Sequence, residues 1–275
     1  GGGSLLQDST SFRSLVYYIV LILVARIKHK PVLLWGQGLG PLRYAWSRYL
    51  VGLVLNSAKS ITWRDSASMQ LAKRIGITTT MSVAPDPVWS HQAKDYQGGG
   101  NIVLCWRPTG LLTPKGWSLL LQAVDQLSDD KGKSVTWFAF HANQDVNLLR
   151  TLSQKGLVPK SLEAKSSTII AKNIEHAQDI FRDASLVVAM RLHAFILSTV
   201  SQCPTVALSY DPKVEAAAQT ADAPWLDLAH LPSLEGIISL WNDCMEQTPS
   251  KSHLQNIQRQ AYKHEQTLKS TLNNL

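Results

Sequence analysis

Two short segments carry side chains that could bind an anion and transfer a proton. The first segment places Arg191 and His193 at the start of a helix that follows the apolar strand predicted at 186–189. The second segment places Asp211 and Lys213 in a loop that follows the next predicted strand. The carboxyl ends of neighbouring parallel strands share one edge of a sheet, where open α/β sheets bind ligands. We therefore predict a cationic site with a titratable imidazole, suited to an anionic substrate and to proton transfer.

Two further arginines stand directly after predicted strands. Arg64 follows the strand predicted at 60–63, and Arg107 follows the strand predicted at 101–106. A planar guanidinium grips a phosphate or carboxylate through two parallel hydrogen bonds, which a lysine cannot reproduce. Each arginine is therefore a candidate substrate contact, although Arg64 could instead pair with Asp65 beside it.

Two glycine-rich segments could cradle an anion with their backbone amides. The first comprises Gly1, Gly2, Gly3 and Ser4. The second runs from Gly36 to Gly40, with Gly38 at its centre. It has neither the GxGxxG spacing of a dinucleotide site nor the GK[ST] of a P-loop. Plain turns use the same residues, so each segment is a candidate ligand contact and no more.

Composition and charge favour a folded enzyme with anionic partners. The chain has 275 residues, of which 45% are hydrophobic and 17% charged, enough for two domains with sizeable cores. Its net charge is +7, which suits phosphorylated metabolites or anionic lipid head groups. The basic residues are not interleaved with aromatic ones as in RNA-binding sheets, so we expect no nucleic-acid partner.

The cysteines and the most apolar run point to a reducing, cytoplasmic location. Cys105, Cys203 and Cys244 are widely spaced and odd in number, so neither a disulfide framework nor a metal site is predicted. The run 15–25 is about half of the roughly 20 residues that span a bilayer. We interpret it as a helix buried under a sheet.

Strand-like runs alternate with helical patterns along most of the chain, which predicts an α/β protein with parallel sheets. The polar, glycine-rich segment 93–100 interrupts this alternation, and we interpret it as an interdomain linker. The predicted domains are 1–92 and 101–249, followed by a C-terminal helix at 250–275. Because a glycine-rich turn opens the chain with no strand before it, we expect the N-terminal domain to be truncated.

Several motifs, taken in chain order, resemble the polysaccharide pyruvyl transferase family, with the closest likeness to its CsaB-type members. They are Gly1-Gly-Gly-Ser-Leu-Leu-Gln-Asp8 with Tyr17-Tyr18, Lys30-Pro-Val32, Gly36-Gln-Gly-Leu-Gly-Pro41, Arg64-Asp65, Asp86-Pro-Val88, Arg191-Leu-His-Ala194 and Ser209-Tyr-Asp-Pro-Lys213. The likeness spans essentially the whole chain. The first motif and Arg-Leu-His-Ala together are fairly specific, whereas each alone is not.

The resemblance implies a GT-B-like architecture of two Rossmann-like domains, with an N-terminal acceptor side and a C-terminal donor side. It implies transfer of a pyruvyl group from phosphoenolpyruvate onto a sugar as a cyclic ketal, with release of phosphate. In CsaB-type members the acceptor is a lipid-linked, N-acetylmannosamine-containing cell-wall precursor. The family's essential Arg, His and Lys match Arg64, His193 and Lys213, with Arg107 and Arg191 as rivals for the arginine.

The remaining expectations concern partners and alternatives. Phosphoenolpyruvate is expected as the donor substrate, with no cofactor and no metal. Lys28, His29, Lys30 and the C-terminal helix are compatible with peripheral contact to an anionic membrane, at the inner face of the cell membrane. One alternative function is a GT-B glycosyltransferase that uses a nucleotide-sugar. Another is a non-catalytic module that binds glycans or lipid head groups.

Overall fold

The chain folds into two compact α/β units. The computed structural model describes residues 5–8, 12–92 and 94–273. Unit 1 comprises Gly1–Ser90 and Asn256–Leu275, and unit 2 comprises His91–Gln255. All strand pairs in the described part of the chain are parallel, as the alternation of strand and helix patterns predicted.

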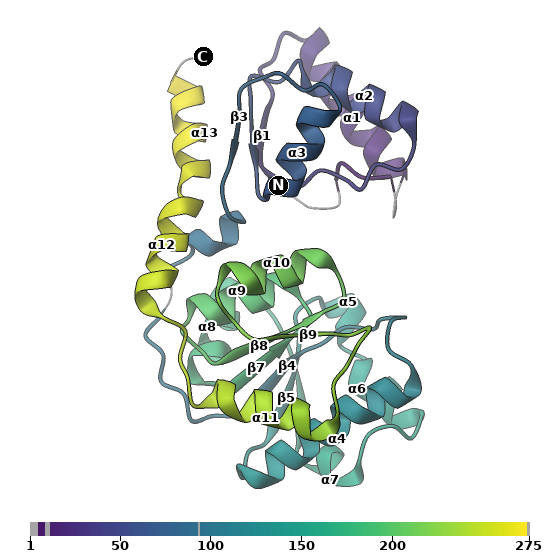
Figure 1. Cartoon of the computed structure of the whole chain (residues 1–275), viewed down its shortest axis with the longest axis vertical. Coiled ribbons are helices and arrows are strands. Elements are labelled where there is room, and N and C mark those ends of the chain that lie inside the picture. Colours follow the sequence, from purple (N-terminus) through teal and green to yellow (C-terminus); the bar gives the residue numbers. More distant parts are fainter. Residues whose placement is uncertain (1–4, 9–11, 93, 274–275) are drawn as a thin grey trace. The chain divides into compact units, whose positions relative to one another are not determined.

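Unit 1 is built on a three-stranded sheet in the order β1-β2-β3. The strands are β1 (Leu33–Gln37), β2 (Ser60–Trp63) and β3 (Met81–Val83). The helices are α1 (Phe12–Ile27), α2 (Ala45–Leu55), α3 (Ser66–Arg74) and α13 (Lys263–Asn273). Figure 1 shows α13 on one face of this sheet and the other three helices on the opposite face. All four residues of β2 are buried, as expected for a central strand covered on both faces.

The helix α1 is buried on one side only, which corrects the prediction of a fully buried helix. Leu15, Ile19 and Ile22 pack into the core of unit 1, while most of the remaining apolar side chains of α1 are exposed. In the described part of the chain, no helix combines the length and the apolar composition that crossing a bilayer requires.

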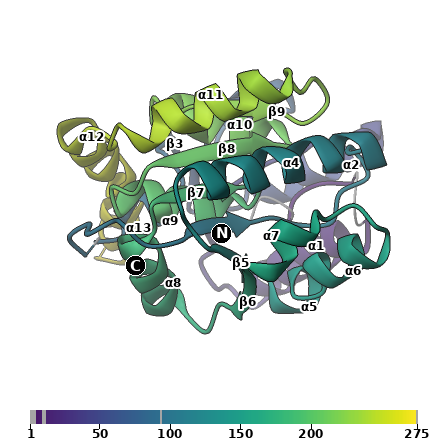
Figure 2. The same ribbon diagram turned by 90° about the horizontal axis from the view of Figure 1, so that it is seen from below.

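Unit 2 contains a six-stranded sheet in the order β6-β5-β4-β7-β8-β9. Its strands are β4 (Ile102–Cys105), β5 (Val135–Ala139), β6 (Ser166–Ile170), β7 (Leu186–Ala189), β8 (Thr205–Ser209) and β9 (Trp225–Asp227). Its helices are α4 (Pro114–Asp130), α5 (Ala142–Asp145), α6 (Leu148–Gln154), α7 (Lys160–Ala164), α8 (Ile174–Asp183), α9 (Leu192–Val200), α10 (Pro212–Thr220) and α11 (Leu234–Met245). Figures 1 and 2 show α8, α9 and α10 on one face of the sheet, and α4 beside α11 on the other.

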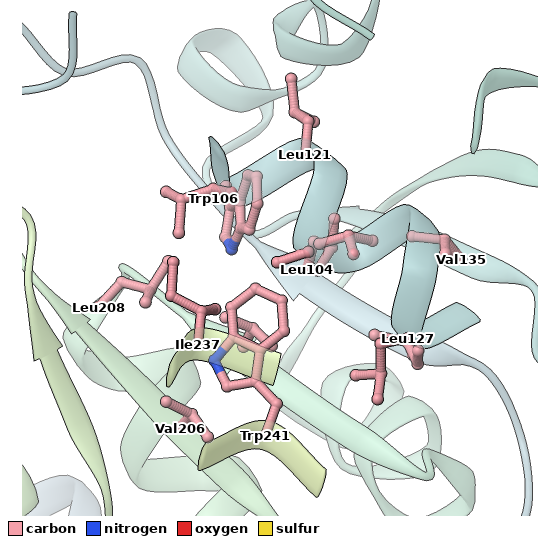
Figure 3. Close-up of a cluster of buried hydrophobic side chains, with 14 of the residues drawn as sticks. Leu104, Trp106, Leu121, Leu127, Val135, Val206, Leu208, Ile237 and Trp241 are labelled. Carbon is pink, nitrogen blue, oxygen red and sulfur yellow. The ribbon is translucent and has the colours of Figure 1, made fainter. Parts of the chain in front are cut away.

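The core of unit 2 lies between the sheet and the pair α4 and α11. Leu121 and Leu127 of α4 and Trp241 of α11 meet strand residues such as Leu104 and Val206 (Figure 3). Thr113 caps α4 by accepting a hydrogen bond from the backbone amide of Gly116, and Pro114 occupies the first helical position.

Residues 94–100, the described part of the segment predicted as a linker, are held against the rest of unit 2. The hydroxyl of Tyr96 donates to the carbonyl of Ala184 at 3.0 Å, and the amides of Gln97 and Gly98 both donate to the carbonyl of Arg182. The division between the units lies instead after Ser90. Glycine-rich composition could not reveal this docking because the hydrogen-bond partners are more than 80 residues away in sequence.

The C-terminal segment predicted as one helix at 250–275 contains two helices. They are α12 (Lys251–Ala261) and α13, and they are separated by Tyr262 alone. Helical hydrogen bonds from Tyr262 to Gln258 and from Gln266 to Tyr262 flank the break. An interruption of one residue leaves the 3.6-residue periodicity intact, so the pattern could not indicate it.

Candidate functional site

The strongest candidate site lies at the carboxyl edge of the unit 2 sheet. The chain runs outward from β4 to β6 on one side and returns to β7 through β9 on the other, so strand order reverses between β4 and β7. In open α/β sheets, ligands bind at such a reversal. β7 also pairs with β8, so the segments that follow these three strands share one edge. This confirms that the strands before His193 and Lys213 are neighbours.

Tyr210 connects two of the predicted cations at this edge. Nη1 of Arg107 donates a hydrogen bond to the Tyr210 hydroxyl at 3.1 Å, and the guanidinium carbon lies 4.7 Å from the centroid of the Tyr210 ring. Nζ of Lys213 lies 5.8 Å from the same centroid. Both separations fall within the range of attraction between a cation and an aromatic ring. Tyr210 therefore brings two positive charges together without neutralising them.

Lys213 lies in the first turn of a helix rather than in the predicted loop. Asp211 precedes α10, and its Oδ1 accepts a hydrogen bond from the Lys213 amide at 3.0 Å. The other oxygen of Asp211 lies 3.1 Å from Nζ of Lys213. Both side chains are more than a third exposed, so this ion pair contributes little to stability. An anionic ligand could replace Asp211 beside the ammonium group at small cost.

His193 is the second residue of α9, and its side chain is exposed. Every later residue of that helix, from Ala194 to Val200, is buried. The His193 side chain therefore does not face the core of unit 2. His193 and Lys213 occupy equivalent places in two consecutive strand-helix units, each at the second position of the helix.

Arg191 is held by a buried carboxylate. Its Nε donates to Asp145 at 3.1 Å, its Nη2 also contacts Asp145, and the Asp145 side chain is only 1% exposed. The same Nη2 donates to Gln144 at 2.8 Å, and Asp145 further accepts from the His141 amide. Through these two contacts Arg191 connects the start of α9 to the segment that follows β5. The charge of Arg191 is therefore paired within the protein.

Arg64 lies in unit 1, at the end of β2, and it also pairs with carboxylates of the protein. Its Nη1 lies 3.3 Å from Asp86 and its Nε 3.8 Å from Asp65, and the Arg64 side chain is 11% exposed. Asp65 caps α3 by accepting from the Ser68 amide at 2.6 Å. The interpretation of Arg64 as part of a local ion pair therefore describes its contacts in this structure.

The glycine segment that begins within β1 is shaped by close packing. Gly36 has φ +56°, and a Cβ there would lie 2.3 Å from Cγ of Pro87. Gly40 has φ +83°, and a Cβ there would lie 2.6 Å from a methyl carbon of Leu71. Both positions therefore require glycine for steric reasons. Gly38 lies between them and is buried.

The first glycine segment is not described by the structure. Gly1, Gly2, Gly3 and Ser4 lie outside the described residues. The neighbouring Asp8 has a structural role, because its carboxylate accepts hydrogen bonds from the amides of Arg43 at 2.7 Å and Tyr44 at 3.1 Å. Burial raises the pKa of Asp8, but these hydrogen bonds outweigh burial and lower the pKa overall.

Of the predicted site residues, Arg107, Arg191, His193, Asp211 and Lys213 lie at one edge of the unit 2 sheet, whereas Arg64 and Gly38 lie in unit 1. Sequence reasoning missed two residues of this edge. Tyr210 stood inside the Ser-Tyr-Asp-Pro-Lys motif without an assigned role, and Asp145 lies outside the motifs that carry the family resemblance. Asp145 accepts a hydrogen bond from the His141 backbone and pairs with Arg191.

Two other features are separate from this edge. Within residues 5–8, 12–92 and 94–273, no group of three His, Cys, Asp or Glu side chains is placed to hold a metal ion. A pocket of about 400 Å³ in unit 2 is lined by Thr205, Pro224 and Cys244, among others. Because Thr205 begins β8 and Pro224 precedes β9, this pocket lies at the amino ends of the strands.

The sequence matches the model of one protein family. The model is described as polysaccharide pyruvyl transferase, and the match covers residues 1–212. This range includes the strand-end segments of β4, β7 and β8 up to Pro212. No curated protein matches the sequence.

Several solved structures share the fold at low sequence identity. HepE from Anabaena in complex with UDP is 14% identical with a TM-score of 0.58, over 94% of this chain and 76% of that one. A protein from Listeria monocytogenes assigned as a UDP-N-acetylglucosamine 2-epimerase is 13% identical with a TM-score of 0.64, over 98% and 74%. A glycosyltransferase from Rickettsia africae is 11% identical with a TM-score of 0.55, over 98% and 84%. The fold is therefore α/β and GT-B-like, with Rossmann-like parallel sheets.

Proposed function

Because the chain belongs to the polysaccharide pyruvyl transferase family, we propose that it moves the pyruvyl group of phosphoenolpyruvate onto a sugar, forming a cyclic ketal. The acceptor in this proposal is a lipid-linked amino sugar of a cell-wall or exopolysaccharide precursor, as in CsaB-type members. The reaction would take place in the cytoplasm, at the inner face of the cell membrane.

The observation that supports this proposal is the pair of cations on Tyr210, beside the helix that carries His193. Phosphoenolpyruvate bears a phosphate and a carboxylate two atoms apart, and it needs positive charge for both. Arg107 and Lys213 rest on one aromatic ring, and in the described residues Arg107 forms no ion pair with a carboxylate. Donors arranged before the substrate arrives stabilise charge that develops during the reaction.

The chemistry needs two proton movements. The methylene carbon of the enol phosphate gains a proton while one sugar hydroxyl attacks the adjacent carbon and loses its own proton. A second hydroxyl then attacks the same carbon, phosphate leaves with its electron pair, and the ring closes. Of the two hydroxyl protons, one ends on the new methyl group and one on phosphate. We assign His193 to this proton traffic, as donor to the methylene carbon or as base on the hydroxyl.

The cationic residues have separate roles in this proposal. Lys213 and Arg107 hold the phosphate and carboxylate of the donor in this proposal. Arg64 keeps the catalytic role that its match to the family's essential arginine implies, with its guanidinium oriented by Asp86 and Asp65. Arg191 positions the start of α9, and therefore His193, through its contact with Asp145.

A glycosyltransferase activity is the second candidate, because solved structures with this fold include HepE in complex with UDP. The two are separated by incubating the full chain and a lipid-linked amino sugar with phosphoenolpyruvate or with UDP-sugars. We expect phosphate release, and a product heavier by a pyruvyl ketal, with phosphoenolpyruvate only. Release of UDP would favour the glycosyltransferase. Binding without turnover of either donor would favour the non-catalytic module.

A further inference from the structure

The positive charge of the chain is concentrated in one segment of unit 1. Residues 9–64 contain eight Lys and Arg residues and no Asp or Glu. The rest of the chain contains 19 Lys and Arg against 20 Asp and Glu, so it is almost neutral. The whole net charge of +7 therefore originates in the stretch that forms α1, β1, α2 and β2.

The same stretch exposes an apolar helix. Ile27 is 74% exposed and Tyr17 is 58% exposed, although both belong to a helix whose opposite side is in the core. Single exposed apolar side chains are ordinary, but a contiguous group on one element marks an interaction surface. The exposed apolar side chains of α1 are Phe12, Val16, Tyr17, Val20, Leu21, Leu23, Val24 and Ile27.

Exposed side chains of α2, and of Tyr44 just before it, extend this surface. Phe12 of α1 meets Trp46 edge to face, with ring centroids 4.7 Å apart, and Tyr44 stacks on Trp46 at 6.2 Å. Tyr49 and Leu53 are also more than half exposed. Tryptophan and tyrosine are enriched where proteins meet the boundary between lipid and water, because each ring joins an apolar body to a polar tip.

A cationic pocket adjoins the carboxyl end of α1. It has a volume of about 480 Å³ and is lined by Arg26, His29, Lys30, Pro31, Val32, Ser57 and Lys59. No acidic residue lines it, and no ion pair within residues 5–8, 12–92 and 94–273 involves Arg26, Lys30 or Lys59. A group of unneutralised cations of this kind suits phosphate groups.

We propose that α1, the exposed aromatic residues of α2 and this pocket form one docking surface for a bilayer of anionic phospholipids. The apolar side chains of α1 enter the boundary between head groups and acyl chains, and the pocket holds lipid phosphates. With 16 residues and one side in the core, α1 lies in the plane of the membrane. Each Lys or Arg held near an anionic leaflet strengthens binding to it.

The charge argues for a lipid partner over a second copy of the chain. Two copies that met through this surface would bring two sets of positive charges together, and like charges across an interface oppose association. An anionic bilayer instead complements both the apolar and the basic residues. The docking surface is independent of the pyruvyl transfer reaction, although it would bring the chain to a lipid-linked acceptor.

The test is sedimentation of the full chain with vesicles, which needs no substrate. We expect binding to vesicles that contain phosphatidylglycerol, weakening as salt rises, and little binding to pure phosphatidylcholine vesicles. The variant R26E/K30E/K59E should bind the anionic vesicles at least tenfold more weakly. The variant V24S/I27S should also bind more weakly, and it should keep its unfolding temperature because both side chains are exposed.

The matched control is R150E/K155E/K160E, which reverses three exposed charges in unit 2 and should bind like the parent. Equal binding by the control and the pocket variant would overturn the proposal, since only net charge would then matter. So would equal binding to both vesicle types, or a dimer in sedimentation velocity that V24S/I27S dissociates. Phosphate release in solution is a separate readout, so failure here leaves the transferase proposal standing.

Discussion

Both units have arginines at the ends of strands, but the groups that contact these arginines differ. Arg64 in unit 1 pairs with Asp86, and both side chains are 11% exposed. Arg107 in unit 2 rests on the ring of Tyr210 and, among the described residues, forms no ion pair with a carboxylate. Unit 2 also holds an arginine of the first kind, Arg191 against Asp145.

This difference distinguishes arginines that stabilise the fold from cations whose charge is available to a ligand. An arginine paired with a buried carboxylate adds no net charge, and breaking the pair leaves a charge unpaired in a poorly solvated place. A cation on an aromatic ring keeps its full charge for a ligand. Arg107 is therefore the cation best prepared for an anionic donor, and Lys213 shares its charge only with the exposed Asp211, whereas Arg64 is already paired with Asp86.

The largest expected effect belongs to His193. Because its side chain is exposed, H193A should leave unfolding unchanged while lowering the rate of phosphate release from phosphoenolpyruvate by about 10²–10⁴. The control is H230A, which removes another exposed histidine that follows a strand of the same sheet. If both variants release phosphate at the parental rate, His193 does not transfer a proton in this reaction.

Removing the carboxylate behind Arg191 should mainly cost stability. D145A leaves the Arg191 guanidinium, 14% exposed, without its partner, and should lower the free energy of unfolding by about 3–5 kcal/mol in urea titrations. D179A removes the carboxylate of an exposed pair with Lys94 and should cost under about 1 kcal/mol. Similar losses in the two variants would mean that Arg191 is no part of the scaffold.

Two variants of one ion pair in unit 1 separate the two roles of Arg64. If Arg64 contacts the substrate as well as Asp86, R64A should lower kcat/KM by about 10²–10³. D86N, which keeps the guanidinium, should retain most of the activity. Both should lower the free energy of unfolding by about 1–3 kcal/mol, because each leaves a largely buried polar group without its charged partner. Equal losses of activity would reduce Arg64 to a structural role.

The smallest expected effect concerns the pH dependence of unit 1. His264 of α13 is buried, and its Nε2 donates to the carbonyl of Pro85 at 2.8 Å, next to Asp86. Burial lowers the pKa of His264 below its ordinary value of about 6.5. The unfolded chain therefore binds a proton that the folded chain resists, and stability falls as pH drops below about 6.5.

The variant H264Q isolates the contribution of His264 to this loss of stability at low pH. It keeps a side-chain amide donor but has no imidazole that could take up a proton. Melting temperatures measured from pH 7.5 down to pH 5 should fall more steeply for the parent than for H264Q. Parallel curves would show that His264 does not contribute to the acid sensitivity of unit 1.

Much of the fold could be predicted because it depends on local patterns. Alternation of apolar runs and helical segments predicted parallel sheets, and the motifs ending in His193 and Lys213 predicted neighbouring strands, which β7 and β8 are. The start of α10 was missed, although Asp211-Pro212 is a recognisable helix start: a capping Asp followed by Pro in the first helical position.

The missed contacts depend on tertiary distance. Tyr210 and Arg107 are 103 residues apart in sequence, and Arg191 is 46 residues from Asp145. No spacing rule connects such pairs, so the sequence could offer three arginines for one role but could not tell which of them a carboxylate already holds. The exposed side of α1 was missed because an apolar run alone does not say what covers it.

Calorimetric titration of the full chain with phosphoenolpyruvate tests the central claim most directly, because it needs no acceptor sugar. If Arg107 and Lys213 hold the donor, the double variant R107A/K213A should raise the Kd by at least about tenfold, the loss of roughly one charge-assisted hydrogen bond. Its unfolding temperature should match the parent's. A Kd equal to that of the parent, in a folded double variant, would contradict the assignment of the donor to the Tyr210 edge of unit 2.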